Sequence, residues 1–341
     1  MAHQVDYDDR LKAARRAVQE ACVVCRAVQT DLENLRSLTK DDRSPVTVAD
    51  FASQAVIARR LREELGEIRM VAEEDVDALR GDANTAIRQR VVDAVRLVWP
   101  EASEADVLDA IDIGTESDAH ASIFWTLDPI DGTKGFLRRG QYAISLGWIE
   151  AGEPTLGVLG CPNLSADFSR PFDDPDPIGC IYFAYKGTGL YEAPANDADA
   201  PGQRLRRLEH DESDAVRICE SVESEHSSQS DSQKVVDYLG RRHETYRLDS
   251  QAKYAVVARG QADAYLRMPT RKGYVEKIWD HAAGALMATE SGCAVTDVSS
   301  RLLEFNHGAR LEANRGIVCA PSALHGQLVD AIQKLGLDRS G

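Results

Sequence analysis

The chain has 341 residues, of which 43% are hydrophobic and 28% are charged, and this composition is that of a folded protein with a sizeable core, not of a disordered segment. Its 56 acidic and 40 basic residues give a formal net charge of −16, which disfavours binding to nucleic acid or to anionic membranes. The apolar runs are too short to span a membrane, and the first residues lack the basic and apolar regions of a secretory signal.

The seven cysteines are scattered along the chain, and their number is odd. Such usage favours a reducing, cytoplasmic location over a disulfide framework. Cys22 and Cys25 form a C-x-x-C pair, but they share one helical face with Val18, Val28 and Leu32. We therefore expect both thiols to pack in the core instead of binding a metal or carrying redox chemistry.

The first part of the chain mixes helices and strands. Apolar residues at every third or fourth position predict a long amphipathic helix at residues 8–38. Residues 100–121 are expected to be a polar stretch, and 165–179 to form a long loop. The other predicted elements are helices at 50–65 and 85–99, and strands at 68–72, 123–127, 142–149, 156–159 and 181–185.

Residues 192–204 have the composition of a loop, and we place a domain boundary there. The prediction is a mixed α/β protein with an α+β domain at 1–204 and an α/β domain at 205–341. In the second domain strands are expected at 215–221, 245–248, 262–268, 294–298 and 316–319, alternating with helices at 231–239, 251–258, 281–291 and 321–334.

The most informative motif is Asp-Pro-Ile-Asp-Gly-Thr-Lys-Gly-Phe at residues 128–136. It follows an apolar run, so Asp128 and Asp131 emerge together at the end of a buried strand. Two close carboxylates repel each other unless a cation lies between them, and hard oxygen ligands suit Mg²⁺. A surface turn without any metal would give the same short motif, so the motif alone leaves both interpretations open.

Three further acidic residues lie at the ends of predicted elements. Glu73 directly follows a strand, whereas Asp50 and Asp280 each begin a predicted helix. The alternative interpretations are a solvated acidic run for Glu73 and ordinary helix capping for Asp50 and Asp280. Capping is also the alternative for Thr133, whose hydroxyl could otherwise orient a water molecule.

Together these motifs resemble those of the Mg²⁺-dependent, lithium-sensitive phosphatases typified by inositol monophosphatase. The resemblance rests on the order and spacing of Ser-Pro-Val-Thr-Val-Ala-Asp at 44–50, Glu-Glu at 73–74, the motif at 128–136 and Trp-Asp-His-Ala-Ala-Gly at 279–284. Within that superfamily the chain is most similar to the 3′(2′),5′-bisphosphate nucleotidases, over roughly residues 8–335. Added support comes from Gly-Cys-Pro-Asn at 160–163, Ser-Gln-Ala-Lys at 250–253 and Ala-Tyr-Leu-Arg at 264–267.

The resemblance implies a layered αβαβα sandwich with its active site between the two domains. It also implies that two or three Mg²⁺ ions are bound by four carboxylates and one backbone carbonyl, and that Asp50 and Thr133 act together on the attacking water. The implied metal ligands are Glu73, Asp128, the carbonyl of Ile130, Asp131 and Asp280.

The expected substrate is adenosine 3′,5′-bisphosphate, which would lose its 3′-phosphate to give AMP, with 3′-phosphoadenylyl sulfate as a second substrate. By resemblance, inhibition by Li⁺ is expected. The resemblance places six residues beside the substrate, namely Thr133, His226, Ser250, Lys253, Arg267 and Asp280. Without it, Lys253 and Arg267 would be read as surface charges and His226 as a solvated loop residue.

Two other functions stay open from the sequence. A phosphatase of the same superfamily that acts on inositol phosphates would have the same metal ligands. A non-catalytic nucleotide sensor would keep the fold but lack one of those ligands, and none is missing here. The sequence does not fix the oligomeric state.

Overall fold

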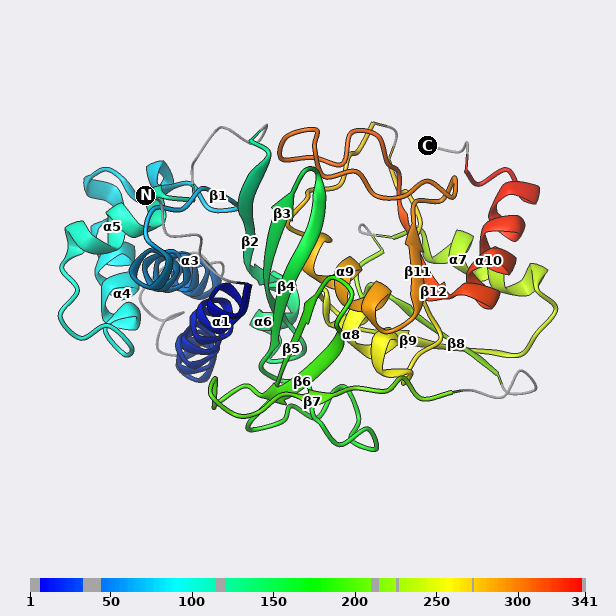
Figure 1. Ribbon diagram of the computed structural model, residues 1–341, viewed down its shortest axis with the longest axis horizontal. Coiled ribbons are helices and arrows are strands. Elements are labelled where there is room, and N and C mark those ends of the chain that lie inside the picture. Colours follow the sequence, from blue (N-terminus) through cyan, green and yellow to red (C-terminus); the bar gives the residue numbers. More distant parts are fainter. Residues whose placement is uncertain are drawn as a thin grey trace.

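The computed structural model describes residues 7–32, 44–114, 121–209, 215–224, 227–271 and 273–338. Two β-sheets and three layers of helices stack in the order α–β–α–β–α, which Figure 1 shows from one side of the molecule to the other. This arrangement confirms the predicted layered sandwich. No helix in the described ranges is long and apolar enough to cross a membrane.

The first sheet has seven strands that lie side by side in the order of the chain. The first two strands are parallel, and every later pair is antiparallel. The strands are β1 (Met70–Ala72), β2 (Ile123–Asp131), β3 (Ala143–Glu150), β4 (Glu153–Cys161), β5 (Cys180–Tyr185), β6 (Gly189–Pro194) and β7 (Gln203–Arg204).

Helices α1 (Tyr7–Thr30) and α3 (Ser44–Leu65) pack against one face of this sheet and against each other. Helices α4 (Thr85–Val95) and α5 (Glu104–Asp112), preceded by the 3₁₀ helices η1 (Val76–Leu79) and η2 (Asp82–Asn84), pack beside α3. Cys22 and Cys25 are buried in the core between α1 and the sheet, as predicted, and burial raises the pKa of both thiols.

The other face of the first sheet contacts helix α9 (Ala282–Glu290), which packs beside α8 (Ala252–Arg259) in the middle layer (Figure 1). Glycines on β3 and β4 allow this close approach, because a Cβ atom on Gly147 would lie 3.1 Å from the Cβ atom of Ala282. The Ala-Ala-Gly of the 279–284 motif is therefore explained by packing between the sheet and α8.

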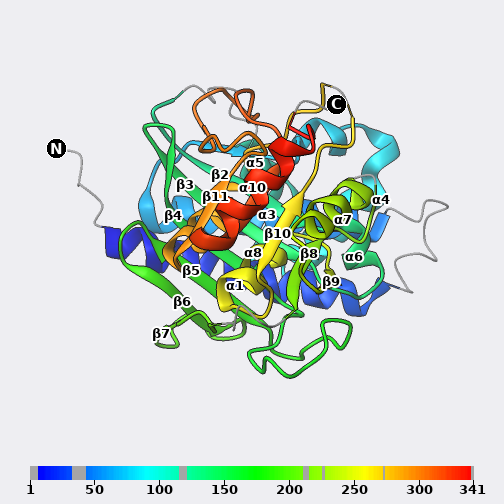
Figure 2. The same ribbon diagram turned by 90° about the vertical axis from the view of Figure 1, so that its right-hand side faces the viewer.

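The second sheet has five strands in the spatial order β11–β12–β10–β8–β9. Helices α7 (Gln229–Tyr238) and α10 (Ser322–Lys334) lie across its outer face, as Figure 2 shows. The strands are β8 (Val216–Glu220), β9 (His243–Arg247), β10 (Ala264–Arg267), β11 (Cys293–Thr296) and β12 (Ile317–Pro321).

Several predicted boundaries are wrong. Helix α5 lies in the polar stretch, for which no helix is predicted; there Ser103 and Asp106 form a capping box, and Val107, Ala110 and Ile111 are buried. Helix α1 ends at Thr30, whereas the prediction ran into residues outside the described ranges. Part of the expected linker at 192–204 belongs to the first sheet, because β7 pairs with β6.

Candidate active site

A cavity of about 640 Å³ lies between the two parts of the chain. Its walls come from the ends of β1, β2 and β10, the beginnings of α6 (Thr133–Leu137) and α8, and the segment before α9. Among the predicted site residues, those that line it are Glu73, Asp128, Ile130, Asp131, Thr133, Ser250, Lys253, Arg267 and Asp280. Asp50 is buried behind the wall, and His226 lies outside the described residues.

The end of β2 is bent by a register shift between Asp128 and Asp131. A bulge of this kind re-aims side chains at the end of a strand. Here it places both carboxylates and the peptide of Ile130 at the cavity wall. The Asp131 carboxylate also accepts a hydrogen bond from the backbone N–H of Gln251, so a residue of the N-terminal part is held by the C-terminal part.

Glu73 is brought to the same point because β1 is parallel to β2. Its backbone N–H donates to the carbonyl of Leu127, at 3.2 Å. The next residue is clamped by Gln54 of α3, whose amide nitrogen donates to the Glu74 carbonyl at 2.8 Å and whose amide oxygen accepts from the Glu74 N–H at 3.2 Å. The turn that carries Glu73 is therefore fixed from both sides.

Asp280 is placed by a network around Gln251. The Gln251 side chain donates to the carbonyl of Trp279 at 2.8 Å and accepts from the hydroxyl of Ser145 at 3.1 Å. This ties the segment before α9 to the first sheet and to α8. Asp280 is then held one residue beyond a fixed peptide, at the edge of the cavity.

The capping alternatives are wrong for three residues. Asp50 lies inside α3, which begins at Ser44. The residue that precedes α9 is His281, not Asp280. Gly132 precedes α6, so Thr133 is its first helical residue. None of the three side chains is thus needed to cap a helix.

Electrostatically, the carboxyl groups behave as one cluster. Burial, and then the charges of Glu73, Asp131, Asp280 and Asp50, hold the pKa of Asp128 well above its ordinary value. Burial and the charge of Asp131 do the same for Asp280. Burial of the Glu73 carboxyl group away from water raises its pKa, although part of the residue is exposed at the cavity. A hydrogen-bonding contact with Asp128 lowers the same pKa.

Asp128 supplies the observation that tests whether divalent cations fit here. It is 2% exposed, and its Oδ1 atom is buried without any hydrogen-bond partner. Such an acceptor is costly to leave unsatisfied. A cation bound by oxygen ligands would satisfy it and would remove the repulsion that raises the pKa values, so the residues present fit a Mg²⁺ site.

Positive groups line the same cavity. Lys253 is buried, and its ammonium donates to the carbonyls of Leu248 and Ser250 at 3.1 and 2.7 Å. Arg267 is also buried, and both ends of its guanidinium contact Glu276, at 2.9 and 2.8 Å. The interpretation of Lys253 and Arg267 as ordinary surface charges is therefore wrong.

Four residues that shape the site received no role from the sequence, namely Gln54, Gln251, Glu276 and Lys277. Gln251 lies within the 250–253 motif, and Glu276 and Lys277 lie just before the 279–284 motif, so their place beside these motifs was the available signal. Gln54 carries no such signal, because a lone glutamine on an apolar helix is uninformative until its partner is known.

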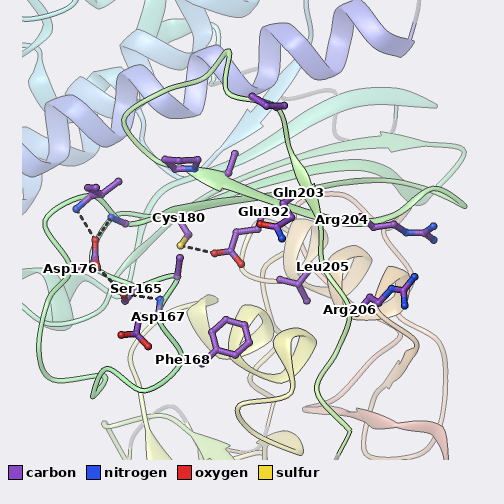
Figure 3. A pocket seen from close by; sticks show the side chains of 16 residues that line it. Ser165, Asp167, Phe168, Asp176, Cys180, Glu192, Gln203, Arg204, Leu205 and Arg206 are labelled. Carbon is purple, nitrogen blue, oxygen red and sulfur yellow. Dashed lines mark hydrogen bonds between the residues drawn. The ribbon is translucent and has the colours of Figure 1, made fainter.

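A second cavity, of about 660 Å³, lies between the 165–179 loop and strands β5 to β7 (Figure 3). The thiol of Cys180 donates to Glu192 at 3.0 Å, and the hydroxyl of Ser165 donates to Asp176 at 2.7 Å. None of the predicted site residues lines this cavity. The candidate active site is therefore the cavity with the carboxylate cluster.

Comparison with known proteins agrees with this geometry. The model of the inositol monophosphatase family matches residues 6–337. The chain belongs to the inositol monophosphatase family. Its members are metal-dependent, in accord with the carboxylate cluster. The family match covers both sheets and all the predicted site residues.

Curated relatives within the family are named 3′(2′),5′-bisphosphate nucleotidase. One from Emericella nidulans is 39% identical over 97% of this chain and 99% of its own length. One from Arabidopsis thaliana is 40% identical over 96% of each chain, and one from Schizosaccharomyces pombe is 36% identical over 96% of each.

Solved structures show the same fold at low sequence identity. CysQ from Bacteroides thetaiotaomicron is 20% identical with a TM-score of 0.61, covering 92% of this chain and 98% of that chain. Inositol monophosphatase from Anabaena is 18% identical with a TM-score of 0.61, covering 95% of each chain.

Proposed function

We propose that this protein is a Mg²⁺-dependent phosphatase that removes the 3′-phosphate of adenosine 3′,5′-bisphosphate, giving AMP and inorganic phosphate. The observation that carries the proposal is the carboxylate cluster with an unpartnered oxygen on Asp128, in a cavity that cationic residues also line. The names and the nearly full-length similarity of the curated relatives support the choice of substrate.

In the reaction, water attacks phosphorus and the bond to the 3′-oxygen breaks, so that the departing oxygen takes a proton. Divalent cations held by Glu73, Asp128, Ile130, Asp131 and Asp280 would supply activation of water and neutralisation of the phosphoryl charge. The protein's own contribution begins with fixing those ligands through the parallel pairing of β1 and β2, the bulge in β2, and Gln251.

Asp50 and Thr133 are proposed to handle the proton of the attacking water. Thr133 is exposed in the cavity, and Asp50 is buried with its pKa raised by burial and then by Glu74 and Glu73. Both are described residues, and no hydrogen bond joins them here. Catalytic hydrogen bonds are often formed only when substrate is bound, so this geometry leaves the pairing as a proposal.

Substrate binding is proposed for Ser250, Lys253 and Arg267, with His226 as a fourth contact from outside the described residues. Ser250 begins the segment that leads into α8, and Arg267 ends β10. Lys253 places a positive charge inside an otherwise acidic protein. This charge favours an anionic ligand such as a nucleotide or a sulfonucleotide, and 3′-phosphoadenylyl sulfate is the proposed second substrate.

The test is phosphate release by the purified protein from three substrates: adenosine 3′,5′-bisphosphate, 3′-phosphoadenylyl sulfate and an inositol monophosphate. We expect turnover of the first two with Mg²⁺, none with EDTA, and inhibition by Li⁺. Faster turnover of the inositol phosphate than of the bisphosphate would assign the protein to the alternative substrate class. Binding of the bisphosphate without phosphate release would make the protein a nucleotide sensor.

A cytoplasmic location is proposed as well, and fractionation of cells would test this location.

A further inference from the structure

Four cationic side chains line the active-site cavity, and three of them already have partners within the protein. Lys134 contacts Glu223 at 3.0 Å. Lys253 donates to two backbone carbonyls, and the guanidinium of Arg267 is paired with a buried carboxylate. The fourth is Lys277, which differs from the others.

The ammonium group of Lys277 lies over the ring of Trp279, 4.7 Å from its centroid. Among the residues that the structure describes, it makes no ion pair with a carboxylate and donates to no carbonyl. Trp279 is 6% exposed, so the ring that faces the ammonium is fixed in the wall of the cavity. A cation above an indole face is stabilised there without losing its capacity to bind an anion.

The backbone also fixes the position of Lys277. Lys277 forms an antiparallel bridge with Arg310, and the N–H of Ile278 donates to the carbonyl of Ala309 at 3.2 Å. The main chain that carries Lys277 is therefore held by pairing with Ala309 and Arg310. Trp279, whose ring lies beneath the ammonium, directly precedes Asp280, and the charge of Lys277 also acts on Glu73. Lys277 therefore lies beside the carboxylate cluster.

We propose that Lys277 binds the phosphoryl group that is transferred to water, and not the second phosphate of the substrate. This inference rests on the proposed function, since it assigns a residue within that active site. When cations neutralise Glu73 and its neighbours, the positive charge of Lys277 has no carboxylate left to balance it. A phosphoryl group held beside the carboxylate cluster provides that balance.

The two reaction products allow a direct test, because inorganic phosphate carries only the transferred group and AMP carries only the second phosphate. Binding of each to the protein in saturating Mg²⁺ would be measured by calorimetry. We expect Lys277→Met to weaken the binding of inorganic phosphate at least 10-fold and to change the affinity for AMP less than twofold. Lys277→Arg keeps the charge and should stay within about threefold of the original protein for both products.

Lys186→Met is the matched control, because Lys186 is exposed and pairs with Glu153 far from the cavity. It should leave both affinities unchanged. The inference is overturned if Lys277→Met weakens the binding of AMP instead of phosphate, or weakens the binding of neither product. It is also overturned if Lys277→Arg loses as much phosphate affinity as Lys277→Met, because the charge would then not be what binds.

A third contrary result is a shift in the Mg²⁺ requirement of Lys277→Met with phosphate affinity unchanged, which would mean that the lysine acts only on Glu73. Failure of the proposed function would give a different result. The original protein would then bind phosphate but release none from adenosine 3′,5′-bisphosphate, and the effect of Lys277→Met on inorganic phosphate would still be measurable. Circular dichroism of each variant verifies that the fold is kept.

Discussion

Gly132 and Ser250 lie so close together that a Cβ atom on Gly132 would be 2.8 Å from the Cβ atom of Ser250. Gly132 belongs to the 128–136 motif of the N-terminal part, whereas Ser250 leads into α8 of the C-terminal part. Both residues have positive φ angles, of +90° and +70°. The two walls of the active site therefore meet at a contact that only glycine permits on one side.

Gly132→Ala should damage both stability and activity. The left-handed backbone costs about 1–2 kcal/mol for alanine, and crowding against Ser250 adds about 1–3 kcal/mol. Gly81→Ala is the matched control, because Gly81 has φ +95° but nothing within 4 Å of its Cβ position. Urea unfolding measures both variants, and we expect Gly132→Ala to lose more stability and nearly all phosphatase activity. Equal losses in the two variants would show that the contact with Ser250 is unimportant.

Asp128→Asn should separate metal binding from folding. Without its charge the cluster loses a proposed metal ligand, so phosphatase activity should disappear and Mg²⁺ should no longer raise the melting temperature. The original protein should melt higher with Mg²⁺ than with EDTA, because a ligand that binds only the folded state stabilises it. Asp174→Asn, on an exposed pair with Arg170, should keep both properties. A normal response of Asp128→Asn to Mg²⁺ would contradict the assignment of this ligand.

The same cluster predicts a pH dependence of stability in EDTA. Burial first, and neighbouring charges second, raise the pKa of Asp128 and Asp280, and burial raises that of Glu74 to about 7. A raised pKa means that the folded state holds protons that the unfolded state releases. The stability from these groups is therefore complete below pH ~4 and is lost as pH rises through the raised pKa values.

The measurement is the free energy of unfolding in EDTA from pH 4 to 8, for the original protein and for Asp128→Asn. We expect the variant to become the more stable of the two as pH rises, by about 1.4 kcal/mol per pH unit across the window of one group. Saturating Mg²⁺ should reverse the order. Parallel curves in EDTA would mean that the Asp128 carboxyl is not held protonated in the folded protein.

Most of the fold could be predicted from hydrophobic patterns, although the partly buried strand β6 was missed because it runs into the 192–204 stretch of loop composition. The other errors of prediction concern single short elements. Helix α5 was missed because its first residues are acidic and its apolar face is short, so only the Ser103–Asp106 capping box marks it. Strand β7 was missed because its two residues are exposed and pair only through the backbone.

The candidate site shows the limits of sequence more sharply. That Glu73, Asp128, Asp131 and Asp280 share one cavity was predicted by resemblance, and the structure brings them together. The residues that fix them were not predictable, because Gln54 and Gln251 act through peptide groups far away in the sequence. The spacing of motifs identifies the functional side chains, but it does not show which backbone groups other side chains hydrogen-bond to in the fold.

Asp50→Asn tests the proposed proton-handling pair. If Asp50 acts through Thr133, Asp50→Asn and Thr133→Val should each lower kcat about 10²–10⁴-fold. The double variant should then be no slower than the slower single variant, because residues that act as a unit are not additive. Thr155→Val is the control, since its hydroxyl contacts Glu150 away from the cavity. Losses that multiply in the double variant would show that Asp50 and Thr133 act independently.

Glu276 offers the last test, because it connects the proposed substrate-binding Arg267 to the fold. Burial raises the pKa of Glu276, but Arg267 and then His281 outweigh it and lower the pKa to about 2. Glu276→Ala would leave a buried guanidinium unpaired and should cost about 3–5 kcal/mol in urea unfolding. Glu153→Ala, which removes an exposed pair with Lys186, should cost at most about 1 kcal/mol.

Replacing Arg267 and Glu276 together by methionine should recover most of the stability but not the affinity for AMP. Packing can replace a buried ion pair, whereas only the guanidinium binds an anion. Unchanged AMP binding in that double variant would remove Arg267 from the substrate site.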